Sequence, residues 1–169
     1  MEVRPARPDD AGAIAAIYAP HVTHGVASFE TVAPDAAEIA RRMAASARNP
    51  WLVAEHGGAV IAYAYAAPFG TRAAYRWAVE TSIYVAAAAQ GHGAGRRLYA
   101  ALLAALEAQG FTQAIGRIAL PNPGSVALHE GLGFELVGIH RRIGWKHGRW
   151  IDVGLWQRQL AEVQASTAP

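Results

Sequence analysis

The chain has 169 residues, of which 53% are hydrophobic and 17% are charged, and its formal net charge at pH 7 is +2. A chain of this length most often forms one domain, and this composition supplies enough apolar side chains for a buried core. The sequence contains no cysteine, which excludes disulfides, cysteine metal ligands and thiolate nucleophiles. The sequence pI is about 9.2, but lysine and arginine are scattered rather than clustered, so we expect no nucleic-acid partner.

The two ends of the sequence carry little targeting information. Residues 1–5 lack the apolar core of a signal peptide, and no apolar run reaches the length of a membrane span. We therefore expect a cytoplasmic protein that does not enter membranes. No linker rich in Pro, Ser or Gly divides the sequence, so we expect a single domain over residues 1–169, with residues 163–169 as a frayed tail.

The first part of the chain predicts a strand followed by a helix. Residues 3–7 alternate weakly as a strand, and Pro8-Asp9-Asp10 can cap a helix whose apolar residues recur at positions 14, 17 and 18. Residues 21–31 show no period. His21 and His24 have the spacing of a metal pair, but no third ligand is placed nearby, so we expect no metal site.

A second helix and a hairpin come next. The helix opens at Pro34-Asp35, ends near residues 49–50 and has one side formed by Ile39, Met43 and Ala47. Residues 51–55 and 60–66 are two strand-like runs joined by the turn Gly57-Gly58, which predicts a β-hairpin.

The second half predicts alternating strands and helices. After an irregular stretch, strands are predicted over residues 79–85, 113–120, 135–145 and 150–159. One helix follows a glycine-rich loop and stops at Gly110, and a short helix starts at Asn122-Pro123 and closes at Gly133-Phe134. This order of elements predicts an α/β fold with a mixed sheet.

Three glycines in five positions separate the strand over residues 79–85 from the helix after it. Because Gly91, Gly93 and Gly95 have no Cβ atom, a ligand can approach the backbone closely at these positions. The N–H groups of the first helical turn point outward at the positive end of the helix dipole. Such a turn is suited to phosphate, although a plain glycine-rich turn between strand and helix remains the alternative.

The glycine loop matches neither of two common phosphate-binding patterns. It lacks the lysine of a P-loop, and it does not follow the Gly-x-Gly-x-x-Gly pattern of dinucleotide folds. Instead, Gln90-x-x-Gly93-x-Gly95 after a strand resembles the pyrophosphate loop of the GNAT superfamily of acetyl-CoA-dependent N-acetyltransferases. The resemblance implies a GNAT-like fold, in which a mixed, mostly antiparallel central sheet is flanked by helices and its central strands splay apart to hold CoA.

Three further segments resemble one branch of that superfamily, the phosphinothricin and methionine sulfoximine or sulfone N-acetyltransferases. They are Arg72-x-x-Tyr75-x-x-x-x-Glu80, residues 122–134, and Lys146-His147-Gly148-x-Trp150-x-Asp152. The likeness covers nearly the whole chain and is more specific than the glycine loop alone. It implies an N-acetyltransferase that uses acetyl-CoA as its cosubstrate and needs no metal.

The resemblance also implies where acetyl-CoA binds. Its pantetheine arm would lie between the splayed strands like an added strand, with its amides bonded to the backbone of Ile83, Tyr84 and Val85. Asn122 would touch the pantetheine or cysteamine arm, or it caps the helix that begins at Pro123. The pyrophosphate would meet the glycine loop, which comprises Gly91, His92, Gly93, Ala94, Gly95 and Arg96.

Acetyl transfer needs a base for the amine, a donor for the oxyanion and an acid for the departing thiolate. The resemblance makes Glu80 the base, directly or through water, whereas the alternative is a charge paired with Arg76 or another surface cation. His129 stands where many GNAT enzymes carry Tyr, and it can serve as the acid, help to deprotonate the amine, or be a core histidine. A backbone N–H near Tyr84 or Val85 is the candidate oxyanion donor. With no Gly-x-Ser-x-Gly elbow and no Cys, direct transfer in a ternary complex is favoured.

The acceptor implied by the resemblance is the α-amino group of a small amino-acid-like substrate, with Phe29, Arg72 and Tyr75 around its far end. Herbicide-detoxifying members carry a Lys two positions before that Arg, where this chain has Gly70, which favours methionine sulfoximine or sulfone over phosphinothricin. The resemblance further implies a homodimer with the active-site mouths near its interface. The alternatives are an acetyltransferase for another small amine and a CoA-binding regulatory module without turnover; an intact Glu80 and His129 argue against the second.

Overall fold

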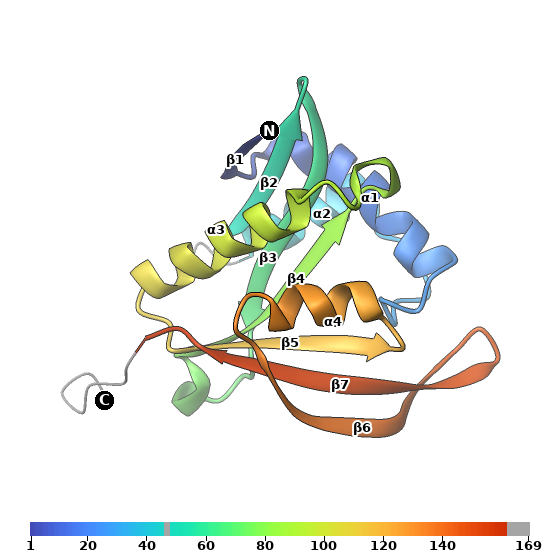
Figure 1. Cartoon of the computed structure of the whole chain (residues 1–169). Coiled ribbons are helices and arrows are strands. Elements are labelled where there is room, and N and C mark those ends of the chain that lie inside the picture. Colours follow the sequence, from blue (N-terminus) through green and yellow to red (C-terminus); the bar gives the residue numbers. More distant parts are fainter. Residues whose placement is uncertain (46–47, 162–169) are drawn as a thin grey trace.

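A computed structural model describes residues 1–45 and 48–161, and within them seven strands form one sheet in the order β1-β2-β3-β4-β5-β7-β6 (Figure 1). Strands β4 and β5 are parallel, and all the other neighbouring pairs are antiparallel. The predicted mixed, mostly antiparallel sheet is therefore confirmed. The strands are β1 (Glu2–Pro5), β2 (Trp51–His56), β3 (Ala59–Pro68), β4 (Ala78–Val85), β5 (Gln113–Leu120), β6 (Glu135–Lys146) and β7 (Arg149–Gln159).

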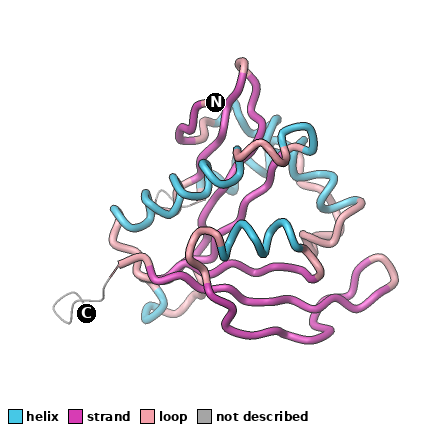
Figure 2. Tube along the Cα trace, viewed as in Figure 1, coloured by secondary structure: helices cyan, strands magenta, loops and turns pink. Residues whose placement is uncertain are grey.

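Helices pack against both faces of this sheet (Figure 2). One apolar core joins the helix after the glycine loop to alternate residues of β3, namely Ala62, Ala64 and Ala66. The other core joins the first two helices to Tyr63, which points to the opposite face because successive strand residues alternate. The α-helices are α1 (Ala11–Thr23), α2 (Ala36–Ala44), α3 (Ala94–Ala108) and α4 (Pro123–Glu130), and short 3₁₀ turns cover Pro8–Asp10, Ala73–Tyr75 and Ala87–Ala89.

The structure corrects two predicted helix boundaries. Helix α1 continues through Pro20 to Thr23, whereas residues 21–31 had no predicted period. Tertiary packing explains the extension, because Val22 lies one turn after Tyr18 and both side chains are buried in the same core. Helix α2 begins at the predicted place, where the Asp35 side chain accepts a hydrogen bond from the Glu38 N–H, but it ends at Ala44. The predicted contribution of Ala47 and the predicted tail, residues 163–169, lie outside the described residues.

The parallel strands β4 and β5 diverge halfway along their length. Residues Ala78 to Thr81 of β4 pair with Gln113 to Gly116 of β5, and the pairing stops there although both strands continue for four more residues. This divergence is the predicted splay of the central strands. It opens the middle of the sheet next to the start of α3 and α4, and Figure 1 shows both helices beside that region.

Candidate active site

A cavity of about 400 Å³ lies where β4 and β5 diverge. Its wall includes Ile83 and Val85 from the end of β4 and Ile118 from β5. The first turn of α3 and one side of α4 complete it, through Gly95 and Leu128 respectively. The cavity is therefore bounded by two strands that no longer pair with each other and by two helices that begin beside them.

The backbone of β4 is directed toward this opening at alternate residues. The Ala86 N–H donates to the Ile61 C=O at 2.9 Å, which makes these two residues a hydrogen-bonded pair of the β3–β4 ladder. Because such pairs alternate along an antiparallel ladder, the amide groups of Tyr84 face β3 and those of Ile83 and Val85 face the opening. Of the three residues predicted to bind pantetheine through their backbone, Ile83 and Val85 thus direct their N–H groups to the cavity, whereas the amide groups of Tyr84 pair with β3.

The glycine loop forms the upper end of the cavity. Gly91 and Gly93 have φ angles of 79° and 78°, a conformation that L side chains rarely adopt, and both line the cavity. The first turn of α3 follows directly, so the N–H groups of Ala94 and Gly95 have no acceptor within the helix. The Gln90 side chain ties this loop to the strand, since its Nε2 donates to the Val85 C=O at 3.2 Å. The local geometry suits an anionic phosphate group.

Asn122 occupies the start of α4, where the structure shows its predicted capping role. Its side-chain oxygen accepts a hydrogen bond from the Ser125 N–H at 3.2 Å, as a helix cap does. The same residue lines the cavity. The cap therefore holds Asn122 at the wall.

Glu80 and Arg117 form an ion pair on the face of the sheet opposite to α3 and α4. The Arg117 guanidinium lies 2.5 Å from the Glu80 carboxylate, and both side chains are partly exposed. Burial raises the pKa of Glu80 above its ordinary value, while Arg117 opposes that shift. Of the partners that the predicted alternative allowed, Arg76 does not pair with Glu80, because its guanidinium lies 5.2 Å from the centre of the Trp77 ring. Arg117 is the other surface cation that the alternative allowed.

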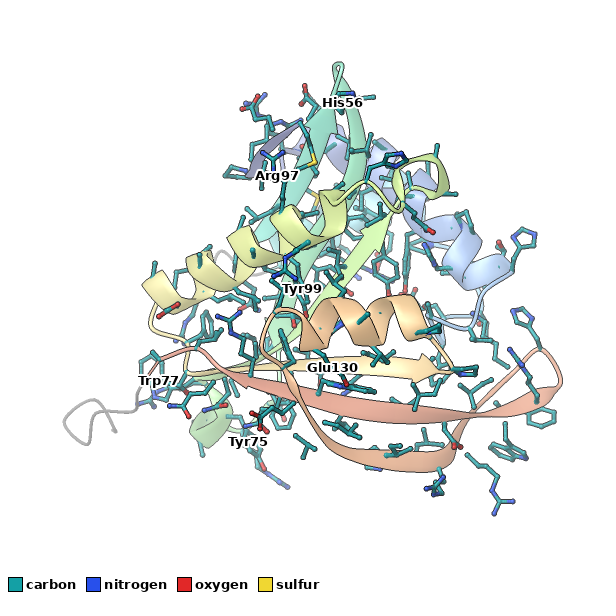
Figure 3. The ribbon with its side chains drawn as sticks, in the orientation of Figure 1. His56, Tyr75, Trp77, Arg97, Tyr99 and Glu130 are labelled. Atoms are coloured by element: carbon teal, nitrogen blue, oxygen red, sulfur yellow. The ribbon has the colours of Figure 1, made fainter. Side chains whose placement is uncertain are left out.

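His129 lies beneath the cavity on the inner side of α4, with 4% of its surface exposed. Its Nδ1 is 2.8 Å from the Ser125 carbonyl oxygen, and its Nε2 is 3.0 Å from the hydroxyl of Tyr99, which reaches across from α3 (Figure 3). Burial lowers the pKa of His129, so the ring is neutral near pH 7. The ring lies so close to β5 that a Cβ atom on Gly116 would come within 2.5 Å of Nε2.

Six of the predicted site residues lie away from the cavity wall. The Phe29 ring packs over Gly144 of β6, where a Cβ atom would clash with it. The remaining predicted substrate residues line a second, smaller cavity beside Gly70, and Figure 3 places Tyr75 near Trp77 below the sheet. Glu80 comes one position before the cavity residues of β4 and does not line the cavity. With two residues of the glycine loop, the six are Phe29, Arg72, Tyr75, Glu80, His92 and Arg96.

Sequence reasoning missed several residues that line the cavity, above all His21, Thr81 and Arg117. The sequence contains a signal that could have identified Arg117 as a candidate site residue, since it is the one charged residue in the strand over residues 113–120. Thr81 carried none, because a β-branched residue is ordinary in a strand.

Comparison with known protein families identifies the family of this chain. The family model described as an acetyltransferase (GNAT) domain matches residues 3–155. The chain belongs to the GNAT acetyltransferase family. The predicted family, its fold and its N-acetyltransferase activity are thereby confirmed.

Individual GNAT relatives resemble the chain over nearly all of its length. A phosphinothricin N-acetyltransferase of Alcaligenes faecalis is 45% identical over 161 residues, covering 94% of this chain and 82% of the relative. An L-methionine sulfoximine/L-methionine sulfone acetyltransferase of Salmonella typhimurium is 35% identical and covers 99% of both chains. The crystal structure of a GNAT phosphinothricin acetyltransferase from Sinorhizobium meliloti in complex with AcCoA has a TM-score of 0.92 at 43% identity, covering 99% of this chain and 92% of that one.

Residues 1–45 and 48–161 contain neither a membrane-spanning helix nor a cluster of metal ligands. No helix in these ranges is long and apolar enough to cross a membrane. No group of three or more His, Asp or Glu residues there could hold a metal ion.

Proposed function

We propose that this N-acetyltransferase transfers the acetyl group of acetyl-CoA to the α-amino group of a small amino-acid-like substrate of the methionine sulfoximine, methionine sulfone or phosphinothricin type. The parting of β4 and β5 beside the glycine loop is the observation that carries the proposal, since it creates a backbone-lined slot next to a phosphate-binding turn. The substrate class rests on the two kinds of relative named above.

The described residues fit acetyl-CoA as cosubstrate. The N–H groups of Ile83 and Val85 and the C=O of Ile83 can bond to the pantetheine amides as an added strand would, while the Val85 C=O accepts from the Gln90 side chain. Gly91 and Gly93 leave the loop backbone open, because no atom lies within 4 Å of where a Cβ atom would be at either position. Asn122 lies at the wall beside the same arm.

In the proposed reaction, two protons leave the substrate ammonium, and the amine nitrogen bonds to the acetyl carbonyl carbon as the C–S bond breaks. Glu80 takes the first proton, directly or through water, and the N–H of Val85 or a neighbouring amide stabilises the oxyanion. The raised pKa of Glu80 makes its carboxylate a stronger base than an ordinary glutamate. Transfer is direct, without an acyl-enzyme.

The test is a panel of amines incubated with acetyl-CoA, with free thiol release as the readout. We expect the sulfoximine, the sulfone and phosphinothricin to be acetylated at the α-amino group, which mass spectrometry of the product identifies. Acetylation of an unrelated amine in preference to all three would refute the substrate class. Acetyl-CoA binding by calorimetry with no turnover of any amine would instead point to a CoA-binding module.

We also propose that the enzyme is a homodimer with its active-site mouths near the interface. Strand β6 is at the edge of the sheet and forms an antiparallel hairpin with β7. Several large apolar side chains on this hairpin are more than half exposed, namely Val137, Ile143, Trp145 and Trp150. Exposed large apolar side chains are enriched at protein interfaces, and Trp145 and Trp150 pack against each other here. Light scattering at micromolar concentration tests the proposal, and a monomer would reject it.

A further inference from the structure

Three buried polar side chains connect α4, α3 and β4 in a continuous hydrogen-bonded chain. His129 Nε2 lies 3.0 Å from the Tyr99 hydroxyl, and that hydroxyl lies 2.6 Å from Thr81 Oγ1. Tyr99 is fully buried, and His129 and Thr81 are each 4% exposed. Thr81 and His129 both line the cavity between β4 and β5, so the chain joins two points of the cavity wall through the buried Tyr99 hydroxyl.

The protons in this chain can be assigned from the donors and acceptors alone. A carbonyl oxygen only accepts, so the contact with the Ser125 C=O at 2.8 Å requires a proton on His129 Nδ1. The ring is neutral, because burial lowers its pKa, and Nε2 therefore carries a lone pair. The Tyr99 O–H must then donate to Nε2, and the Thr81 O–H donates to the Tyr99 oxygen.

A competing arrangement has Thr81 donating to the Ile115 carbonyl, which is 3.3 Å away. Tyr99 would then donate to Thr81, leaving two lone pairs facing each other at the 3.0 Å contact with His129. The 2.6 Å contact between Thr81 and Tyr99 is also much the shorter of the two that Thr81 makes. The first arrangement is therefore favoured, and in it the hydroxyl groups of Thr81 and Tyr99 both donate toward His129 Nε2.

We propose that Thr81 and Tyr99 form a proton path through which His129 accepts the second proton of the substrate amine. This rests on the proposed function. As the N–C bond forms and the C–S bond breaks, the amine proton passes to Thr81 Oγ1, the Thr81 proton passes to the Tyr99 oxygen, and the Tyr99 proton passes to Nε2. The imidazolium then returns one proton along the same path to the thiolate sulfur, so that the free thiol leaves and the neutral ring is restored.

The path assigns the two amine protons to two different residues, whereas the sequence did not distinguish the roles of Glu80 and His129 in removing them. Glu80 lies on one face of β4 and Thr81 on the other, because successive strand residues alternate. Glu80 accepts the first proton of the substrate ammonium and releases it to solvent. His129 transfers the second proton from the amine nitrogen to the thiolate sulfur. His129 thus acts as an acceptor first and as an acid only afterwards.

The kinetic test compares Thr81→Val with Thr81→Ser. Valine keeps the shape of threonine and loses the hydroxyl, whereas serine keeps the hydroxyl and loses a methyl group. For a proton path we expect Thr81→Val to lower kcat by about a hundredfold, with Thr81→Ser within about threefold of wild type and acetyl-CoA affinity unchanged in both. A packing role for Thr81 predicts that Thr81→Ser is at least as damaging as Thr81→Val, and that order would overturn the proposal.

Tyr99→Phe provides an independent test with a matched control. It should lower kcat as much as Thr81→Val does, and the double variant should be no worse than either single variant, because each change breaks the same path. Tyr63→Phe removes another buried phenol hydroxyl, on the other face of the sheet, and should leave kcat unchanged. Additive losses, or an equal loss from Tyr63→Phe, would contradict a shared path.

A measurement without substrate separates this inference from the proposed function. The ¹⁵N NMR shifts of the imidazole, assigned with His129→Gln, should report a neutral ring protonated at Nδ1 in the resting protein. A ring protonated at Nε2 would overturn the path, since Tyr99 could not donate to it. If wild-type protein acetylates no amine of the panel, the proposed function fails, while this tautomer still supports or refutes the assigned proton order.

Discussion

The carboxylate of Glu80 and the guanidinium of Arg117 lie side by side on the parallel strands β4 and β5, 2.5 Å apart, close to the point where these strands diverge. Arg117 lines the cavity, and Glu80 precedes the cavity residues of β4 by one position. Burial raises the pKa of Glu80 and the Arg117 charge and hydrogen bond lower it, so the cation restrains the basicity of the proposed base. This opposition leads to two predictions.

The first prediction concerns the pH profile. Arg117→Met removes both influences that lower the pKa of Glu80, so that pKa should rise. Because the base must be ionised, the acidic limb of kcat/KM should move to higher pH, with activity lost at pH values where wild type still works. Arg76→Met is the matched control, since Arg76 stacks on Trp77 rather than pairing with Glu80. An acidic limb that stays in place or moves to lower pH in Arg117→Met would contradict the pairing.

The second prediction tests Glu80 itself. Glu80→Gln keeps the size of the side chain and removes its basicity, and general bases typically contribute about a hundredfold to ten-thousandfold. We expect kcat to fall by that order, with acetyl-CoA affinity by calorimetry unchanged. Glu107→Gln, on the exposed side of α3, is the control for the loss of one carboxylate. A fall of less than about threefold would favour a purely structural ion pair with Arg117.

The third prediction concerns the glycine loop. Gly93→Val should weaken acetyl-CoA binding, because a side chain would project where the phosphate approaches the backbone. Gly93 has a φ of 78°, so valine there is also strained, and Gly58 in the β2–β3 turn is a close match with a φ of 80° and equally open surroundings. Gly58→Val should therefore cost similar stability by thermal melting and leave binding intact. Equal affinities in the two variants would remove the loop from the binding site.

Much of the architecture could be predicted because its signals are local. The hairpin turn at Gly57-Gly58, the cap at Asp35 and the helix stop at Gly110 each depend on residues within one turn of the chain. The splay of the central strands came from the family resemblance. Periodicity within one strand carries no information about where its neighbour leaves it.

The site was harder to predict wherever partners come from distant segments. Glu80 and Arg117 are 37 positions apart, and Tyr99 and His129 are 30 apart. Arg76 is close to Glu80 in sequence and is therefore a predicted partner for it. Arg117 lies beside Glu80 only because of the register between β4 and β5. The roles of the predicted site residues remain predictions, which the variants described here test.

The fourth prediction concerns Lys146, the one lysine in the sequence, which is 92% buried (8% exposed). Its ammonium group donates to the backbone carbonyls of Ser28 and His21, and among the described residues no carboxylate forms an ion pair with it. These bonds hold the loop after α1 against the β6–β7 hairpin. Removing the donor leaves buried carbonyls unpaired, at about 1–3 kcal/mol for each such group.

Lys146→Met keeps the aliphatic stem and removes the charge. We expect its free energy of unfolding to fall by about 1–3 kcal/mol in urea, in line with one unsatisfied buried acceptor. Arg149→Met on the same hairpin removes an exposed cation and should change stability little. Equal urea midpoints for Lys146→Met and wild type would show that the loop does not depend on this contact.

The last prediction concerns the choice among acceptors. Gly70 stands where herbicide-detoxifying relatives are expected to carry Lys, so one cation is missing beside Arg72 and Tyr75. Phosphinothricin presents an anionic phosphinate at neutral pH, whereas the sulfone and sulfoximine groups are neutral. Because a hydrogen bond to a charged group contributes roughly 1.5 to 3 kcal/mol, the neutral substrates should gain about tenfold to a hundredfold in relative kcat/KM.

Side-by-side kcat/KM measurements at saturating acetyl-CoA provide the test. Gly70→Lys is the complementary variant, but a Cβ atom there would lie 3.1 Å from the Tyr75 ring, so the ring must shift for the lysine to fit. We therefore expect Gly70→Lys to improve phosphinothricin relative to the sulfone while lowering kcat/KM for both. Arg48 and Arg76 line the same cavity as Gly70, but both guanidinium groups stack on Trp77. Wild-type enzyme that prefers phosphinothricin by tenfold or more would refute the argument from Gly70, because its pocket would then stabilise the anion without the lysine.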